Sequence, residues 1–178
     1  MNNKDIFKLV KTKDTTELEL ALEKGLITDI NLSEAGMKTT LLMTAVCLEL
    51  VKSVKLLLEC GADPNLKNIY GKTPLHLLPD VQPIEHPSWE KRIEIANLLL
   101  KNGADISILD NNNREPLWYA IFYMKKPEDI ELVKLLLKSG GNPNFKVGPD
   151  ISPLDQAIRM NYQPLIDILE NEDKKNKL

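Results

Sequence analysis

Apolar residues occur in short runs, and four of these runs end at a glycine. The four are Leu20–Gly25, Leu56–Gly61, Leu98–Gly103 and Leu135–Gly140. Glycine adopts the left-handed backbone conformation without a Cβ clash, so a glycine directly after an apolar, helix-forming run predicts the end of a helix. The glycines are 36, 42 and 37 residues apart, which is the range of helical units stacked in solenoids.

A short polar turn follows three of these glycines. The turns cover residues 61–65, 103–107 and 140–144, and the first copy is looser, around 29–31. Asp63, Asp105 and Asn142 recur at one position of the turn, where a side-chain acceptor is needed. These residues are therefore expected to hold the turn and not to bind calcium, whose twelve-residue ligand pattern is missing.

A second signature begins each unit. In Gly71-Lys72-Thr73-Pro74-Leu75-His76, Thr73 predicts an N-cap and Pro74 the first helical position. Residues 152–155 repeat this chemistry, residues 39–42 keep the threonine, and residues 115–118 keep the proline with Glu115 as a poorer cap. Each unit is predicted to be a capped helix, a turn, a second helix ending in leucines, and an extended turn.

These motifs resemble the ankyrin repeat, whose units carry Gly-x-Thr-Pro-Leu-His near the start and Leu-Leu-x-x-Gly-Ala-Asp-x-Asn near the end. Residues 67–77 and 98–107 match best. The resemblance implies one all-α ankyrin-repeat solenoid of four to five units, including caps. The expected boundaries are an N-cap unit at 3–35, units at 36–68, 69–110 and 111–147, a C-cap unit at 148–170, and a frayed tail at 171–178.

Two segments depart from the regular unit. The third unit carries extra residues at 78–88, whose three prolines predict an extended loop between its two helices. Ser88 is expected to cap the next helix, with Trp89 in its first turn. In the fourth unit, residues 126–129 mark a lengthened turn.

Composition narrows the classes of function. The 178 residues include 23 basic and 26 acidic ones, for a formal charge of −3, and only three are arginines, so nucleic-acid binding is not expected. The charge is compatible with a partner that has a basic face but does not decide the matter. The chain shows no signal-peptide pattern and no apolar run near the ~20 residues that span a membrane, which predicts a cytoplasmic protein without membrane contact.

Candidate catalytic chemistry is sparse. Cys47 and Cys60 lie in apolar helical patterns and are expected to be small buried hydrophobes. By resemblance, His76 is the structural histidine that hydrogen-bonds its own turn and the neighbouring unit, and His86 belongs to a surface loop. Zinc spacing, a phosphate loop and a nucleophile elbow are missing, so we expect no enzyme activity, catalytic residue, cofactor or metal.

The resemblance also implies where a partner would bind, because ankyrin solenoids use turn tips and the exposed face of each first helix. The residues projected onto this concave face are Ile69, Tyr70, Lys72, Asn111, Asn112, Arg114, Phe122, Tyr123, Ile151, Arg159 and Met160. The expected centre of the face is Tyr70, Arg114, Phe122 and Tyr123. Apolar tip residues could add a patch, namely Leu66, Ile108, Leu109, Phe145 and Val147.

Residues 118–123 hold four of the nine aromatic residues. Trp118 takes the place of the family histidine, and Tyr119 and Ile121 fall at packed positions, so these three are expected in the core. Phe122 and Tyr123 fall at exposed positions and have the composition of a binding hot spot. The alternative is that this bulky helix packs on the inserted loop as core.

The sequence thus predicts a non-enzymatic module that binds another protein, and we expect it to be a monomer. The alternatives are a stoichiometric inhibitor, such as a bacterial immunity protein that neutralises a toxin, an effector delivered to a host cell, or an adaptor. A nucleic-acid reader is the outlying class, and strongly salt-dependent DNA or RNA binding would support it.

Overall fold

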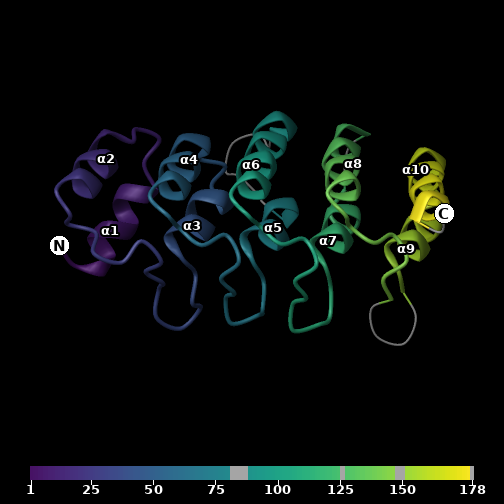
Figure 1. Cartoon of the computed structure of the whole chain (residues 1–178), viewed down its shortest axis with the longest axis horizontal. Helices are drawn as coiled ribbons and strands as arrows, with labels where there is room; N and C mark the ends of the chain where they lie inside the picture. Colours follow the sequence, from purple (N-terminus) through teal and green to yellow (C-terminus); the bar gives the residue numbers. More distant parts are fainter. Residues whose placement is uncertain (81–87, 125–126, 147–150, 177–178) are drawn as a thin grey trace.

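The computed structural model describes residues 1–80, 88–124, 127–146 and 151–176. Within them, five helix pairs follow one another along a single axis (Figure 1). The first helices of the pairs are α1 (Asn3–Val10), α3 (Leu41–Cys47), α5 (Pro74–Leu77), α7 (Pro116–Phe122) and α9 (Pro153–Arg159). The second helices are α2 (Thr16–Glu23), α4 (Val51–Glu59), α6 (Trp89–Lys101), α8 (Ile130–Lys138) and α10 (Gln163–Asn176).

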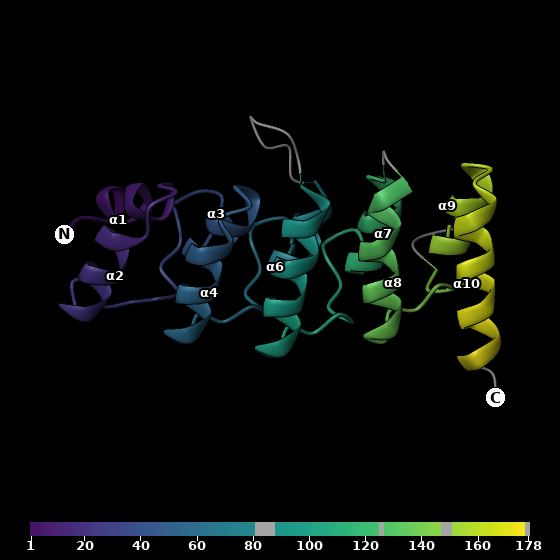
Figure 2. The ribbon, with the colours of Figure 1, turned by 90° about the horizontal axis from the view of Figure 1, so that it is seen from above.

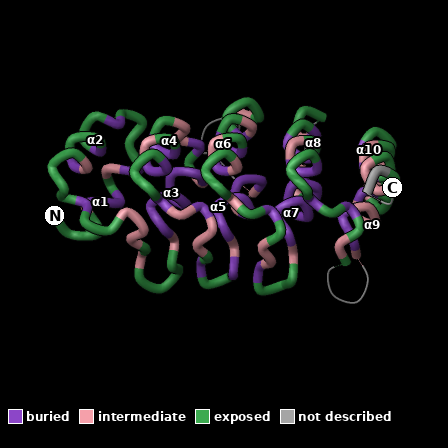
Figure 3. Tube along the Cα trace, viewed as in Figure 1, coloured by how far each residue is buried: buried purple, intermediate pink, exposed green. Residues whose placement is uncertain are grey.

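The helices form two rows, and the long turns between pairs project from the row of first helices (Figure 1). Seen from above, the second helices lie side by side along the stack (Figure 2). Each helix packs on its own partner, and the first helices as well as α4, α6, α8 and α10 also pack on the matching helix of the next pair. Burial follows the same layout: the buried segments, in purple, gather on the first helices (Figure 3). Exposed segments, in green, lie on the turns and on the second helices, which we call the outer helices. The predicted all-α solenoid is confirmed, and its core is distributed between neighbouring units.

The glycine stops work as predicted. Gly61 has a φ of 85°, its N–H donates to the Leu58 carbonyl at 3.0 Å, and the Ala62 N–H donates to the Leu57 carbonyl at 2.9 Å. This pair of hydrogen bonds is the Schellman motif, which satisfies the last carbonyls of a helix. Gly25, Gly103 and Gly140 also lie in the left-handed region, so every leucine-rich run ends by one mechanism.

The acceptor side chains of the turns are also confirmed. Asp63 Oδ1 accepts the Asn65 N–H at 2.8 Å. Asn65 then reaches the next unit, where its Nδ2 donates to the Gly103 carbonyl and its Oδ1 accepts the Asp105 N–H, both at 2.8 Å. Asn31 accepts the Asp63 N–H in the same way at 2.9 Å. These asparagines hydrogen-bond each unit to its neighbour.

The helix starts follow the predicted capping chemistry. Thr40 Oγ1 accepts the Met43 N–H at 3.1 Å, and Ser152 Oγ accepts the Asp155 N–H at 3.1 Å. Ser88 caps α6, which begins at Trp89 as expected. Glu115 makes no capping hydrogen bond at the start of α7, as its side chain predicts.

The irregular segments differ from expectation in two places. Leu78–Asp80 forms a 3-10 turn, η1, instead of extended loop, and residues 81–87 of the predicted loop lie outside the described residues. At the other end, α10 continues through Asn176, so the segment expected to be a frayed tail is helical to that point. The buried Leu165 and Leu169 hold α10 against the stack. The lengthened turn of the fourth unit is a second 3-10 turn, η2 (Pro127–Asp129).

One link between units is irregular. Ser107 stands where Asn65 stands one unit earlier, and its Oγ donates to its own Asp105 at 2.7 Å. The Asn142 N–H of the next unit is instead hydrogen-bonded by Glu115. This carboxylate is buried, its Oε2 has no hydrogen-bond partner among the described residues, and burial raises its pKa.

We therefore expect the double substitution Ser107→Asn with Glu115→Thr to raise the free energy of unfolding by about 1–2 kcal/mol at pH 7. It supplies an N-cap and the asparagine link, and it removes a carboxylate whose burial costs stability above its unfolded pKa. Urea unfolding measures the change. Asn65→Ser is the matched control and should lose about 1 kcal/mol. A double variant no more stable than the parent would contradict this account.

Candidate functional site

Helix α7 carries two columns of stacked side chains. The Trp118 and Phe122 rings stack at 4.7 Å between centroids, because residues four apart lie on one helix face. The Arg114 guanidinium lies 3.8 Å from the Trp118 ring centroid and completes this column. We call Arg114, Trp118 and Phe122 the first column.

The second column consists of Lys72, Tyr119 and Tyr123. The Tyr119 and Tyr123 rings stack at 6.1 Å, and Lys72 Nζ lies 4.1 Å from the Tyr119 centroid. Lys72 belongs to the preceding unit, so this column crosses the boundary between units. Each column therefore has a cation at one end, a ring in the middle and a second ring at the other end. The cation makes a cation–π contact with the middle ring of its own column.

Burial divides the aromatic residues of α7. Trp118, Tyr119 and Ile121 are in the core, as predicted, whereas the Phe122 side chain is 48% exposed, also as predicted. Tyr123 is half-buried and thus less exposed than expected. Its ring contacts Tyr119 and Phe122, and burial together with a hydrogen bond to Asp80 raises the pKa of its hydroxyl. The alternative that this helix packs on the inserted loop stays untested, because residues 81–87 of that loop lie outside the described residues.

A hydrogen-bonded network supports the columns from behind. His76 Nδ1 accepts the Thr73 N–H at 3.2 Å, so Nε2 carries the proton and donates to the Arg114 carbonyl at 2.9 Å. His76 thus binds its own turn and the next unit, which confirms its structural role. Because the ring is buried, its pKa falls to about 4.

Asp110 completes the network. Tyr119 donates its hydroxyl to Asp110 Oδ2 at 2.5 Å, and the N–H groups of Asn112 and Arg114 donate to Oδ1. Burial opposes the charge of Asp110, but these hydrogen bonds keep its pKa below the usual value. Burial raises the pKa of Tyr119 to about 12, so its hydroxyl remains a donor at neutral pH.

The hairpin tips form a separate exposed row. The Ile69 N–H donates to the Met37 carbonyl at 3.1 Å, and the Asn111 N–H donates to the Tyr70 carbonyl at 3.0 Å. Gly71 is required here, because its φ is 74° and a Cβ would lie 2.7 Å from the Asn111 nitrogen. Met37, Ile69 and Tyr70 are 42%, 40% and 51% exposed and give the tips an apolar surface.

The predicted binding residues fall into two groups. Ile69, Tyr70, Asn111 and Asn112 lie at the tips, and Lys72, Arg114, Phe122 and Tyr123 belong to the columns. Within the part of the chain that the structure describes, the Tyr70 ring contacts no other aromatic ring, and its place on one binding face with Phe122 and Tyr123 stays a prediction. On the neighbouring helix, Arg159 is exposed and Met160 packs against the core. Ile151 is half-buried.

Several residues differ from expectation or were not predicted. Met37 and Leu48 are exposed apolar residues that the sequence pattern did not indicate. The apolar turn residues Leu66, Ile108, Leu109 and Phe145 are half-buried and form no exposed patch, and Val147 lies outside the described residues. Cys60 is exposed rather than buried, and Cys47 is half-buried, with its pKa raised to about 11 by burial.

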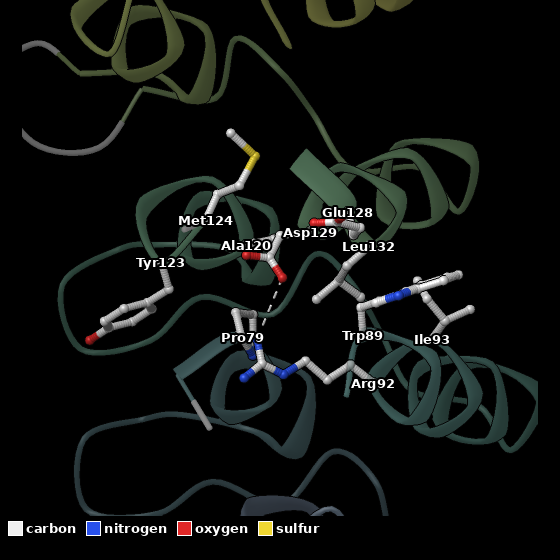
Figure 4. Close-up of a pocket in the computed structure, with 10 residues that line it drawn as sticks. All are labelled: Pro79, Trp89, Arg92, Ile93, Ala120, Tyr123, Met124, Glu128, Asp129 and Leu132. Atoms are coloured by element: carbon white, nitrogen blue, oxygen red, sulfur yellow. Dashed lines mark ion pairs between the residues drawn. The ribbon is translucent and has the colours of Figure 1, made fainter. Parts of the chain in front are cut away.

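A buried ion network was also not predicted. Arg92 of α6 bonds Glu49 Oε1 through Nε at 2.9 Å and pairs with Asp129 Oδ1 through Nη1 at 3.8 Å. The Glu49 side chain is only 2% exposed. Figure 4 shows Arg92 and Asp129 in a hollow beside Trp89, Tyr123 and Met124. Its open volume is about 10 Å³, room for about one water, so a small-molecule ligand does not fit.

The described residues show neither a metal-binding cluster nor a membrane-spanning helix. Among those residues, no three or more His, Cys, Asp and Glu side chains are placed to hold a metal ion. Nor does any described helix combine the length and the apolar character that a membrane span requires.

Stacked helix pairs with projecting hairpin tips and an inner helix face define a helical-repeat solenoid. The family model described as Ankyrin repeat matches residues 38–69 and 70–111. The chain belongs to the ankyrin-repeat family. Ankyrin repeats are generally protein–protein interaction modules, and the family is typically non-enzymatic.

Similar proteins include two from viruses and one from a bacterium. A Fowlpox virus protein named as an ankyrin repeat protein is 35% identical over 85% of this chain and 18% of its own length. An Acanthamoeba polyphaga mimivirus protein of the same description is 30% identical over 68% of this chain and 14% of its own length. One from Rickettsia felis is 47% identical over 29% of this chain and 21% of its own length. The chain thus spans less than a fifth of the two viral relatives.

Proposed function

We propose that this chain is a non-enzymatic module that binds another protein through its concave face. The face comprises the hairpin tips and the two columns on α7. The observation that carries the proposal is the exposure of Phe122 at the end of a column whose other ring, Trp118, is buried. An exposed ring fixed in this way has the properties of a binding hot spot.

The physical reason is preorganisation. Phe122 is stacked on Trp118 and in edge contact with Tyr123, so its ring loses little conformational freedom when a partner covers it. Burial of an aromatic ring removes a large apolar area from water. Arg114 lies in the same column, and arginine and aromatic residues are the residue types enriched at interface hot spots.

The hairpin tips add further exposed apolar residues to this surface. Met37, Ile69 and Tyr70 are exposed apolar side chains on hairpins that hydrogen-bond one another. Two rigid areas, the tips and the end of α7, suit a partner that spans both. The modest exposure of each residue is consistent with a face assembled from several units and not from one pocket.

We expect Phe122→Ala to weaken partner binding at least tenfold while the melting temperature stays nearly unchanged. The substitution removes the exposed anchor but leaves Trp118 and the core in place. The test is affinity capture from source-cell lysate with quantitative mass spectrometry, followed by measurement of Kd for the captured protein. Leu20→Ala, at a 46% exposed leucine on the outer helix α2, is the matched control. A partner retained equally by the Phe122 variant would refute the proposed face.

A further inference from the structure

We propose that the segment bound on the concave face is an acidic stretch of the partner protein. Its carboxylates would meet Lys72 and Arg114, and an adjacent apolar side chain would pack on Phe122. This inference rests on the proposed function and adds the chemistry of the partner.

The first argument is that the carboxylates of this face already have donors. Asp110 accepts the Tyr119 hydroxyl and two backbone N–H groups. Asp155 accepts both the N–H and the hydroxyl of Ser152, at 2.9 and 2.8 Å. Asp80 is hydrogen-bonded by Tyr123. The acidic groups are thus occupied within the protein and have little capacity left for a basic partner.

The second argument is that the cations lack anions. Among the described residues, no carboxylate forms an ion pair with Lys72 or Arg114. Both residues are half-buried, so part of each side chain stays open to a partner. Arg159, one helix along, adds a further exposed cation. Lys72 and Arg114 are therefore cations without a counter-charge, and carboxylates complement them.

The third argument is that aromatic rings hold both cations in place. Arg114 lies 3.8 Å from the Trp118 centroid, and Lys72 lies 4.1 Å from that of Tyr119. A guanidinium held over a ring loses less freedom when it binds a carboxylate, and its fork matches the two carboxylate oxygens. The rings also reduce hydration of the cations, which strengthens a charge-assisted hydrogen bond.

The net charge of the whole chain does not decide the chemistry of this face. The charge of −3 is compatible with a basic partner, but on this face the carboxylates are hydrogen-bonded within the protein, whereas Lys72 and Arg114 form no ion pair among the described residues. Three arginines in the chain form no stripe along a nucleic-acid backbone, so the geometry favours a protein ligand over a polynucleotide.

The test is selection of random 16-residue peptides displayed on phage against the whole chain, with Kd then measured by fluorescence anisotropy. We expect the selected peptides to combine Asp or Glu with an aromatic or aliphatic residue, and to bind more weakly at higher salt. Arg114→Gln and Lys72→Gln should each weaken binding about tenfold, and Arg114→Lys should restore part of the loss. Lys101→Gln, on the exposed end of α6, is the control and should bind normally.

The outcomes separate this inference from the proposed function. Peptides that depend on Phe122 but are neutral or basic, and bind the Arg114→Gln variant normally, overturn the acidic partner and leave the proposed face intact. Peptides that bind the Phe122→Ala variant as tightly as the parent overturn the proposed face itself. Binding of a labelled mixed-sequence 20-nucleotide single-stranded DNA, sensitive to Arg114→Gln and without any acidic peptide selected, overturns the protein ligand. Melting curves establish that each variant is folded.

Discussion

Substitution of Arg92 by methionine is expected to lower the free energy of unfolding by about 3–5 kcal/mol, because it leaves a buried carboxylate without its cation. Glu49 accepts from Arg92 Nε at 2.9 Å, and its side chain is 2% exposed. Asp129, 16% exposed, loses a cation as well. Equilibrium unfolding in urea at pH 7 measures the change.

Two further variants test the cause of this loss. In the double variant Glu49→Gln with Arg92→Met, the amide can still accept the Ser88 N–H that Glu49 Oε2 binds at 3.3 Å, and the unpaired charge of Glu49 is gone, so part of the stability should return. Lys55→Met is the control, because it breaks an exposed pair with Glu59 and should cost less than about 0.5 kcal/mol. If Arg92→Met costs no more than Lys55→Met, the ion network does not stabilise the fold.

Acidification is expected to destabilise the protein through His76. Burial lowers its folded-state pKa to about 4, against about 6.5 for an unfolded histidine. The unfolded chain therefore binds the proton first, and the contribution of His76 is complete above pH 6.5 and declines as the pH falls towards 4. Two and a half pKa units correspond to about 3 kcal/mol lost by pH 4.

The matched variant is His76→Gln, which keeps a donor for the Arg114 carbonyl but does not titrate. Its free energy of unfolding should be lower than that of the parent at pH 7.5. Between pH 7.5 and pH 4, the difference between the two proteins should change by about 3 kcal/mol in favour of the variant. Urea unfolding at pH 7.5, 6, 5 and 4 gives the comparison, and carboxylate titration affects both proteins alike. A gap that stays constant with pH would show that His76 does not carry this linkage.

The parts of the fold that depend on neighbouring residues could be predicted from the sequence. Gly61 ends a helix because the residues before it are helical and its own φ is positive. Thr40 and Ser152 cap helices with hydroxyls three residues from the N–H groups that they accept. The extent of α10 was not predicted, because the residues after Leu169 are polar and indicate a frayed end. The helix continues because the buried Leu165 and Leu169 already anchor it.

The candidate site was predicted only in part, because much of it depends on contacts between units. The four-residue spacing of Trp118 and Phe122 places both rings on one face of a predicted helix, and Arg114 lies just before the N-cap of that helix. The approach of Lys72 to Tyr119 and the pairing of Glu49 with Arg92 join residues far apart in sequence, and no local pattern encodes them. The partial burial of Tyr123 was not predicted, because its hydrogen bond to Asp80 also joins it to the preceding unit.

The ion network of Glu49, Arg92 and Asp129 has a consequence for cooperativity. In a stacked array each unit normally stabilises only its immediate neighbours, so the ends open before the middle. Here one guanidinium of α6 pairs with both neighbouring units at once, through Glu49 between α3 and α4 and Asp129 just before α8, so the opening of either unit removes one of its anions. The three central helix pairs should therefore melt as a single block, and α1/α2 and α9/α10 should exchange their amide hydrogens first. The exposed Phe122 lies within that block, so its position survives local opening at either end.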